Sequence, residues 1–340
     1  MGDLPLPPAE LARRVGVLDQ NDPVGSFDAM GENLRQTILS LQGSDWFSEG
    51  RRVLDFGCGP GKLLRHFIGE AENCEFIGCD IDEPSINWLR ENFSPPLNVF
   101  VCGEKPGLPL PDDHIDLGLA ISVFTHLTEH WAGWLLEIHR VLRPGGRFIC
   151  TFLGRGMSET IAGEAWNADR IGMNILHPWR PWDQGGPSVQ HSEWWLRAHW
   201  GRAFEFERVE DRDESSHGLI VLRKREVELN EDDLRTPEPG EAREVTALQH
   251  NVARLSAEAV ALGADCETVM RELNAVRDDR ELVIAQLDTV RADRGGTAPQ
   301  HDAARERVGE LEAQIAAMRS TAAWRWATRY WRMRARIRGT

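Results

Sequence analysis

Three glycines at every second position give the first sign of chemistry in this 340-residue chain. Gly57, Gly59 and Gly61 follow the apolar run VLDF, which contains Asp55. Glycine in an ordered segment costs conformational entropy, so it is kept where the backbone must approach another group closely. The helix expected to begin near Gly61 adds N-terminal amides and the positive end of its dipole. The stretch predicts a ligand site built largely from backbone.

Carboxylates and imidazoles recur after later apolar runs. Asp80 ends the run CEFIGCD, 23 residues after Gly57. His126 and His130 follow the apolar segment that ends near residue 122. Histidine titrates near neutral pH, so either imidazole could act as a general base. Capping a helix, or lying on its surface, is the alternative role for each.

The same residue types do not predict a metal site. Asp112 and Asp113 are adjacent, and neighbouring side chains on a strand point to opposite faces. The six cysteines contain no CxxC pair, so neither a zinc site nor a disulfide framework is indicated. We therefore expect no metal and reduced thiols.

The elements that must position these residues alternate up to about residue 225. Apolar runs predict strands at 51–56, 74–80, 98–103, 114–122 and 146–153, with helical patterns at 61–71, 83–93 and 130–142. This alternation predicts an α/β fold with a doubly wound, mostly parallel sheet. Two further strands, 204–210 and 217–225, would form an antiparallel hairpin and bring the sheet to seven strands. In such sheets the ligand lies at the carboxyl ends of the strands, where the strand order reverses.

The pattern Asp55-x-Gly57-x-Gly59-x-Gly61 resembles the class I methyltransferases that use S-adenosylmethionine (SAM), over roughly residues 27–225. The resemblance implies their Rossmann-like fold and SAM as the cofactor. A dinucleotide-binding turn would instead read G-x-G-x-x-G, with a glycine at the position of Lys62. This spacing disfavours a nucleotide-dependent oxidoreductase.

The resemblance also implies individual roles. Asp80 would accept hydrogen bonds from both ribose hydroxyls, Ile81 would lie beside the adenine, and Ser122 would lie beside the methyl donor. The implied cofactor-binding residues are Asp55, Gly57, Cys58, Gly59, Gly61, Asp80, Ile81, Glu104, Ser122 and Phe124. Glu104 is placed near the adenine amino group, although Gly103 stands where the family's acid more often falls. A tight strand–helix turn without a ligand is the alternative for the glycines.

The acceptor side is less defined. Methyl transfer from an activated sulfonium mainly needs alignment and exclusion of water, but a hydroxyl acceptor also needs a base. His126 is our candidate catalytic residue. The insertion at 154–202 carries Trp166, Trp179, Trp182, Trp194, Trp195 and Trp200. Such rings suit a flat or partly apolar acceptor, or a sugar; the alternative is that four of the six form the core of a small lid. His177 precedes a proline and is assigned to a turn in preference to chemistry. For His191, capping a helix and catalysis are competing roles.

Beyond the first domain, residues 1–225, the composition changes. An acidic, proline-containing stretch at 226–242 reads as a linker. Apolar residues then alternate spacings of three and four over 243–292, which predicts a coiled coil and self-association, most simply as a dimer. A lone amphipathic helix on the first domain is the alternative. After the break RGGTAPQ a second helix is expected over 300–338, which could fold back on the first.

The C-terminal residues 319–340 hold seven arginines and no acid, with aromatic residues between them. Basic charge beside aromatics predicts an interfacial helix on an anionic membrane surface; a capping helix on the coiled coil is the alternative. The tail resembles those of enzymes of bacterial surface-polysaccharide assembly, which implies a sugar or glycan hydroxyl as the acceptor. The net charge of −15 argues against a specific nucleic-acid partner.

The sequence thus predicts a cytoplasmic SAM-dependent methyltransferase, peripheral at the inner face of the membrane through its tail. Nothing in the N-terminal residues has the basic-then-apolar order of a signal peptide. The alternative function is a coiled-coil scaffold or regulatory protein whose methyltransferase-like domain is inactive. The intact glycine turn and Asp80 weigh against that alternative.

Overall fold

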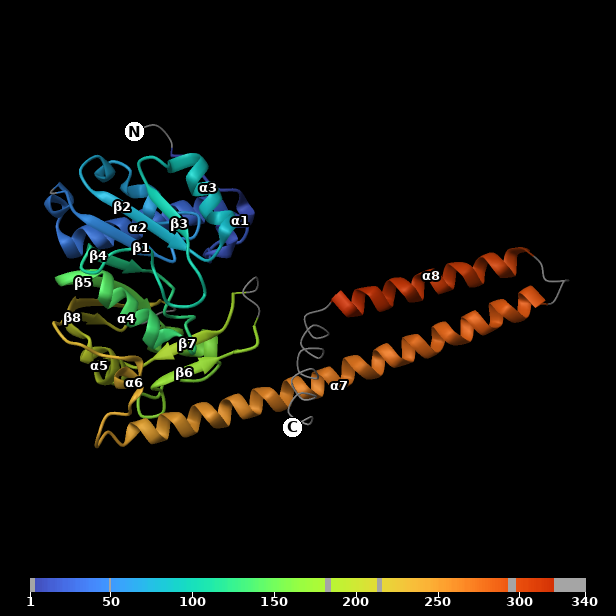
Figure 1. Ribbon diagram of the computed structural model, residues 1–340. Coiled ribbons are helices and arrows are strands. Elements are labelled where there is room, and N and C mark those ends of the chain that lie inside the picture. Colours follow the sequence, from blue (N-terminus) through green and yellow to red (C-terminus); the bar gives the residue numbers. More distant parts are fainter. Residues whose placement is uncertain (1–3, 49, 181–184, 213–215, 293–297, 321–340) are drawn as a thin grey trace. The chain divides into compact units, whose positions relative to one another are not determined.

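The computed structural model describes residues 4–48, 50–180, 185–212, 216–292 and 298–320 (Figure 1). The chain divides into two units, residues 1–252 and 253–340. Each unit is described by itself below.

The first unit is built on a seven-stranded sheet in the order β3-β2-β1-β4-β5-β9-β8. The strands are β1 Arg52–Phe56, β2 Glu75–Asp80, β3 Asn98–Val101, β4 Ile115–Ala120, β5 Leu142–Phe152, β8 Phe204–Glu210 and β9 Gly218–Lys224. The first five run parallel, whereas β9 is antiparallel to both β5 and β8. The predicted mostly parallel sheet with a terminal hairpin is confirmed. The strand order reverses between β1 and β4.

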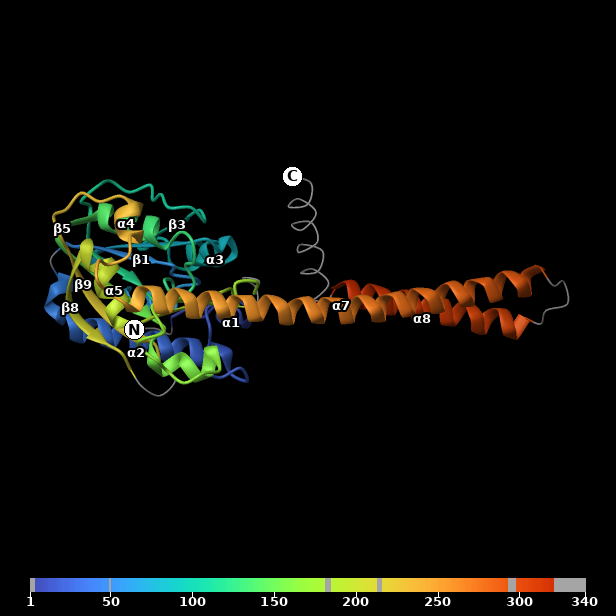
Figure 2. The same cartoon turned by 90° about the horizontal axis from the view of Figure 1, so that it is seen from below.

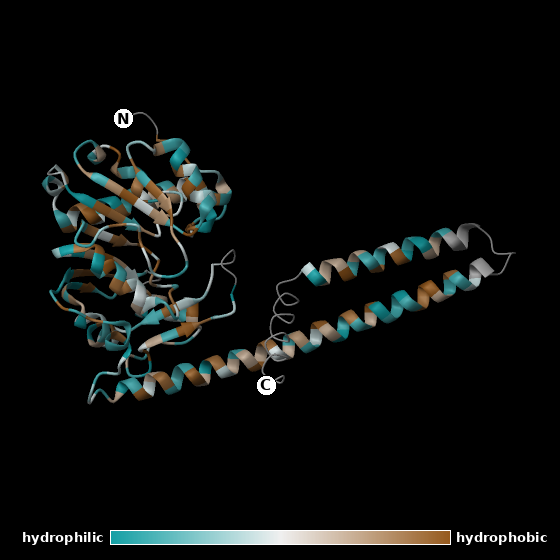
Figure 3. Cartoon of the chain, in the orientation of Figure 1, coloured by the Kyte–Doolittle hydropathy of each residue, from teal (hydrophilic) through white to brown (hydrophobic). Residues whose placement is uncertain are grey.

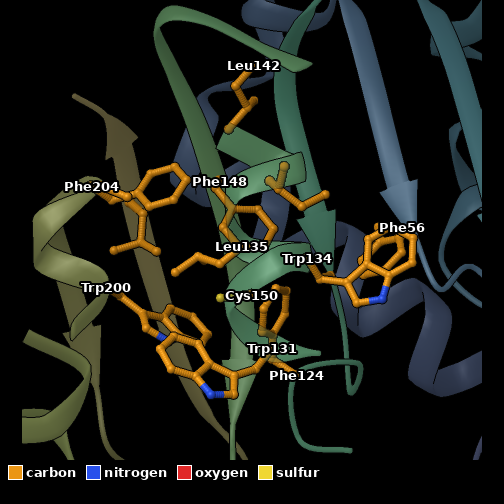
Figure 4. Packing of buried hydrophobic residues seen from close by; sticks show 14 of the residues in the cluster. Phe56, Phe124, Trp131, Trp134, Leu135, Leu142, Phe148, Cys150, Trp200 and Phe204 are labelled. Atoms are coloured by element: carbon orange, nitrogen blue, oxygen red, sulfur yellow. The ribbon is translucent and has the colours of Figure 1, made fainter. Parts of the chain in front are cut away.

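Helices cover both faces of this sheet, because successive residues along its central strands are buried. Figure 3 shows apolar residues along the strands of the first unit. On one face, α2 Pro23–Gln42 and α3 Glu83–Phe93 pack against Val53, Phe76 and Leu117. On the other face, α4 Trp131–Val141 contributes Trp131, Trp134 and Leu135 to an aromatic core with Phe56, Phe124, Phe148 and Trp200 (Figure 4).

The helix predicted over 61–71 takes a different form. The structure has two short 3₁₀ turns there, η2 Leu64–Phe67 and η3 Glu70–Glu72. Bonds that span three residues, such as the one from His66 N–H to the Leu63 carbonyl at 3.1 Å, replace those of a regular α-helix. Leu64 and Phe67 are buried, so packing decides the local backbone here over helical propensity.

The insertion between β5 and β8 forms a small layer of its own. It contains the turns η4 Arg155–Met157 and η5 Ser158–Ala162, a two-stranded sheet and α5 Glu193–His199, followed by η7 Trp200–Arg202. Its strands, β6 Met173–Leu176 and β7 Ser188–His191, are antiparallel. A backbone bond joins β7 to the loop after β4, because Val189 N–H donates to the Thr125 carbonyl at 2.7 Å.

The segment read as a linker contains a short helix, α6 Glu231–Arg235. Asn230 begins it with a capping box, in which Asn230 and Asp233 each accept from the other's backbone N–H. Leu234 is fully buried against the aromatic core of the first unit. Part of this acidic stretch is therefore packed onto the domain.

Two long helices follow, α7 Arg243–Ala292 and α8 Ala298–Ser320 (Figure 2). Within the second unit α8 runs back along α7. Arg280 pairs with Glu312 at 3.0 Å and Arg307 with Asp279 at 3.3 Å. The apolar stripe is buried at Cys266, Leu273, Val283, Leu287 and Leu311. The fold-back that the sequence left open is present, while pairing with a second chain stays a prediction.

None of the helices in the described part of the chain has the length and apolar content to cross a bilayer. The basic tail predicted to be an interfacial helix continues past Ser320 and lies outside the described residues.

Candidate functional site

The glycine turn lies at the carboxyl end of β1, where the strand order reverses. Gly57, Gly59 and Gly61 have φ values of 77°, 52° and 79°, a region that side chains disfavour. A Cβ at Gly57 would lie 2.3 Å from Val123 Cγ2, and one at Gly59 would lie 2.3 Å from Val15 Cγ1. Both the backbone conformation and the close neighbours therefore require glycine.

Asp80 stands beside this turn as the last residue of β2. Its Oδ2 accepts from Gly59 N–H at 2.7 Å, and its Oδ1 accepts from Asp82 N–H at 2.8 Å. A carboxylate oxygen can accept more than one hydrogen bond, so Asp80 keeps the capacity to accept from ribose hydroxyls as well. Burial raises the pKa of Asp80, and the bonds from backbone N–H groups oppose that rise.

Ile81 follows Asp80 with 45% of its surface exposed. An exposed apolar side chain beside a hydroxyl-binding carboxylate matches a nucleoside, whose flat base adjoins its ribose. The residues at the end of β2 therefore fit the adenosine part of SAM, as the sequence implied.

A buried carboxylate and a buried ammonium group lie under the turn. Burial raises the pKa of Asp55 to about 7, the charge of Asp80 adds to the rise, and Lys62 opposes it. Burial also lowers the pKa of Lys62 to about 8, with Asp55 opposing. Lys62 Nζ donates to the Val15 carbonyl at 2.9 Å.

An N-terminal segment, residues 4–22, lies against the glycine turn and contains α1 Ala9–Arg14. Arg14 pairs with Asp82 at 2.7 Å, just after the Asp80 carboxylate. Further along, Arg65 donates to the Pro5 carbonyl at 3.0 Å. The segment is thus tied to residues on both sides of the turn.

Two of the expected cofactor-binding residues, Phe124 and Cys58, have buried side chains, whereas Glu104 is exposed. The ring of Phe124 is fully buried against Trp200, with ring centroids 4.9 Å apart (Figure 4). Cys58 is only 5% exposed. Glu104 is exposed, and its carbonyl oxygen accepts from Trp134 Nε1 at 3.1 Å. For Phe124 and Cys58, only the backbone can border a ligand.

Ser122 follows β4 at the same edge and has a left-handed backbone, with φ at 62°. Its N–H donates to Thr151 Oγ1 at 2.8 Å, and its Oγ lies 3.2 Å from His217 Nδ1. His126 is held nearby, because its Nδ1 donates to the Pro187 carbonyl at 2.7 Å. Burial lowers the pKa of His126, the bond to the Pro187 carbonyl opposes that shift, and the charge of Arg180 adds to it.

His217 is the residue that sequence reasoning missed. Burial lowers its pKa to about 4, and the nearby His126 and Lys62 add to that shift. The signal was the position of His217 directly before the last strand in HGLIVL. An antiparallel strand begins at the edge where its parallel neighbours end, so the residue before it reaches the site.

The described tryptophans of the insertion do not form the lid core of four rings that the alternative expected, because only two are buried and both belong to the main core. Trp195 and Trp200 are buried in the core, and Trp194 Nε1 donates to the Ala168 carbonyl at 2.8 Å. Trp166 and Trp179 are half-buried. Trp182 lies outside the described residues.

The two histidines of the insertion have structural surroundings. His191 is fully buried, its ring packs against Trp195, and burial lowers its pKa to about 3. The residue that caps α5 is the next one, Ser192, whose side chain accepts from Trp195 N–H. His177 contacts the Ile161 carbonyl through Nε2 at 3.1 Å, in a turn with φ at 50°.

The described residues contain no group of three or more His, Cys, Asp or Glu placed to hold a metal ion. The adjacent acids Asp112 and Asp113 lie in a turn before β4, not on a strand as expected, and they have different partners. Asp112 pairs with Arg140 and Asp113 with Lys224, each at 2.6 Å.

Comparison with known proteins matches residues 54–150 to the family model of a methyltransferase domain. Over 103 residues, 30% of this chain, it is 35% identical to a fatty-acid O-methyltransferase of Mycolicibacterium smegmatis, covering 37% of that protein. Over 36% of the chain it is 32% identical to a phthiotriol/phenolphthiotriol dimycocerosates methyltransferase of Mycobacterium ulcerans, covering 44% of that protein.

A third relative is a demethylmenaquinone methyltransferase of Symbiobacterium thermophilum, 30% identical over 40% of this chain and 60% of its own length. The chain therefore spans less than two thirds of the length of these relatives. The matched region, residues 54–150, runs from β1 to β5 and holds the glycine turn, Asp80 and His126. The match supports a methyltransferase domain with S-adenosylmethionine as its cofactor.

Proposed function

We propose that this protein transfers a methyl group from S-adenosylmethionine to an oxygen atom of a small acceptor. The observation that carries the proposal is the Asp80 carboxylate, which accepts from Gly59 N–H of the glycine turn and from Asp82 N–H just after the end of β2. The domain match over residues 54–150 supports the same reaction class.

The chain's own residues account for binding and orientation. Asp80 would hold the ribose and Ile81 would flank the adenine. The backbone of the turn at Gly57–Gly61 would contact the rest of the donor. When bound, the donor supplies an activated methyl group. The protein then has to align the acceptor oxygen, exclude water and accept a proton.

The sugar or glycan hydroxyl expected from the sequence remains a finer proposal. Trp166 and Trp179 are the half-buried rings of the insertion on which a sugar face could stack. Trp195 and Trp200 are buried in the core, so they leave fewer aromatic rings that a sugar acceptor could contact. The relatives carry names of lipid and quinone methyltransferases, so acceptors of those classes should be tested beside a sugar.

The alternative is a scaffold or regulatory protein whose domain no longer binds SAM. Calorimetric titration with SAM separates the two. We expect binding by the native chain, and a loss of about 1.5–3 kcal/mol in Asp80→Ala, the value of hydrogen bonds to a charged group. The matched control is Glu75→Ala, at the opposite end of β2, where an exposed ion pair with Arg52 is worth little.

No heat of binding in the folded native protein would favour the scaffold. Equal SAM affinity in Asp80→Ala and Glu75→Ala would show that the donor lies elsewhere. Transfer of a labelled methyl group to a glucoside, a fatty acid and a quinol would then rank the acceptor classes.

A further inference from the structure

Ser122, expected beside the methyl donor, forms a side-chain pair with His217, a residue to which donor binding assigns no role. Ser122 Oγ lies 3.2 Å from His217 Nδ1, while Ser122 N–H donates to Thr151 Oγ1 at 2.8 Å. A residue other than glycine at a φ of 62° is uncommon and persists where its surroundings hold it. The pair is therefore built into the end of β4.

Sheet topology brings His217 to that place. In the antiparallel pairing of β5 with β9, Gly218 lies opposite Phe152, the last residue of β5. His217 therefore lies just past the end of β5, beside the end of its parallel neighbour β4. His126, from the loop after β4, is close enough that its charge would lower the pKa of His217.

The two imidazoles are held differently. His126 Nδ1 must carry a proton, because its partner is the Pro187 carbonyl, which can only accept. His217 is held through Nδ1 by Ser122, and none of the described residues hydrogen-bonds to its Nε2. A hydroxyl can accept as well as donate, so Nδ1–H can donate to Ser122 Oγ and leave a lone pair on Nε2.

We propose that Nε2 of His217 takes the proton of an alcohol hydroxyl on the acceptor, with Ser122 as the positioning residue that fixes the ring. This inference rests on the proposed function and deepens it, because an alcohol needs a base whereas an ionised carboxylate does not. The alcohol oxygen bonds to the methyl carbon as the carbon–sulfur bond of the donor breaks with its electron pair going to sulfur, and the hydroxyl proton ends on Nε2.

The surroundings of His217 suit this task. Burial holds its pKa at about 4, with His126 and Lys62 contributing, so the ring is neutral and able to accept at pH 7. Ser122 from the end of β4, His126 from the following loop and Lys62 from the glycine turn are the polar groups identified around it. A proton taken in the reaction would then leave readily to water.

The decisive measurement needs no acceptor. Two-bond ¹H–¹⁵N correlation spectra of the full chain report the protonation of each imidazole nitrogen, and His217→Asn identifies the His217 signals by their loss. We expect a neutral ring at pH 7 with the proton on Nδ1, and a shift toward the other tautomer in Ser122→Ala. A proton on Nε2, or a cationic ring at pH 7, would overturn the proposal.

A second arm follows transfer of a labelled methyl group to methyl glucoside. Asparagine at position 217 keeps a group that can bond to Ser122 but removes Nε2. We expect unchanged SAM affinity by calorimetry and a fall in transfer of about 10²–10⁴-fold, the usual effect of losing a general base. The matched control is His114→Asn, just before the opposite end of β4, with unchanged transfer.

The outcomes separate the two proposals. Native protein that fails to bind SAM contradicts the proposed function and, with it, the role of His217. Native protein that binds SAM and methylates the glucoside, with full transfer retained in a folded His217→Asn, would contradict the role of His217 alone.

Discussion

Asp55 links the stability of the molecule to its candidate donor site. Its carboxyl is 2% exposed, and burial raises its pKa to about 7. The unfolded-state value is about 3.9, so the folded state binds more protons between these two values. The contribution of this group to stability is therefore full below about pH 4 and is lost as the pH rises through about 7.

We expect Asp55→Asn to remove this pH dependence. In the native protein the linkage amounts to about 1.4 kcal/mol per pH unit across the window between the two pKa values. Urea unfolding at pH 5 and pH 7 would measure it in both proteins. Lys62 adds its own slope only above about pH 8, since burial lowers its pKa to about that value.

Asp45→Asn provides the control for that comparison, because Asp45 is an exposed carboxylate in η1 Ser44–Ser48. It should keep the native slope between pH 5 and pH 7. An unchanged slope in Asp55→Asn would mean that the Asp55 carboxyl titrates in the folded state as it does in the unfolded chain.

The glycine turn makes a prediction about a whole element. Gly59→Ala places a Cβ in a left-handed backbone and against Val15 Cγ1, so both strain and a clash arise. Left-handed strain alone costs about 1–2 kcal/mol. We expect a larger loss of unfolding free energy, together with faster amide exchange in the N-terminal segment, as measured by mass spectrometry.

Gly145→Ala is the matched comparison. Gly145 has a φ of 70°, and nothing lies within 4 Å of the position that a Cβ would take, so this variant isolates the cost of strain. Equal losses in the two variants, with no change in exchange over residues 4–22, would show that Val15 moves away without consequence.

Elements with local signals were predictable from the sequence, and those set by packing were not. Helix α3 spans the predicted residues 83–93, because Asp82 caps it and Pro84 stands in its first turn. The stretch 61–71 lacks a comparable capping residue and proline, and burial of Leu64 and Phe67 favoured 3₁₀ turns there over a regular α-helix.

At the site, Asp80 and the glycines could be placed because their spacing follows a single strand–turn–helix unit. His217 could not, since it reaches Ser122 across 95 residues of sequence through the order of the strands. The direction of the Phe124 ring, into the core, likewise depends on neighbours such as Trp200.

For the molecule as a whole, the apolar stripe of α7 could be buried in two ways, by α8 of the same chain or by a second chain. Part of it is covered by α8, whereas Val245 and Leu248 are 60% and 64% exposed. We expect the full chain to self-associate through these exposed positions as a dimer of about 77 kDa, twice 38.4 kDa, by light scattering. Leu248→Glu should shift the mass toward the monomer.

Gln249→Glu, which adds the same charge at the next position, should leave the dimer intact. A native chain of 38.4 kDa would instead mean that the fold-back of α8 satisfies the stripe within one molecule.

The arginine-rich tail remains a prediction about membranes. Each arginine near an anionic surface contributes about 1 kcal/mol, so seven are enough for reversible binding. We expect sedimentation with anionic but not neutral liposomes, weakened by added salt and abolished by truncation after Ser320. Protein that stays in the supernatant with both liposomes would favour the capping alternative.

The ties of the N-terminal segment bear on the timing of catalysis. Contacts at Val15, Arg14 and Pro5 hold residues 4–22 beside the glycine turn. We expect the spent donor to leave only after these contacts break. Methylated product would then form quickly in the first turnover, while later turnovers would wait for the N-terminal segment to open. In rapid-mixing experiments this predicts a burst of product followed by a slower steady-state rate, because release of the spent donor, and not methyl transfer, limits the rate.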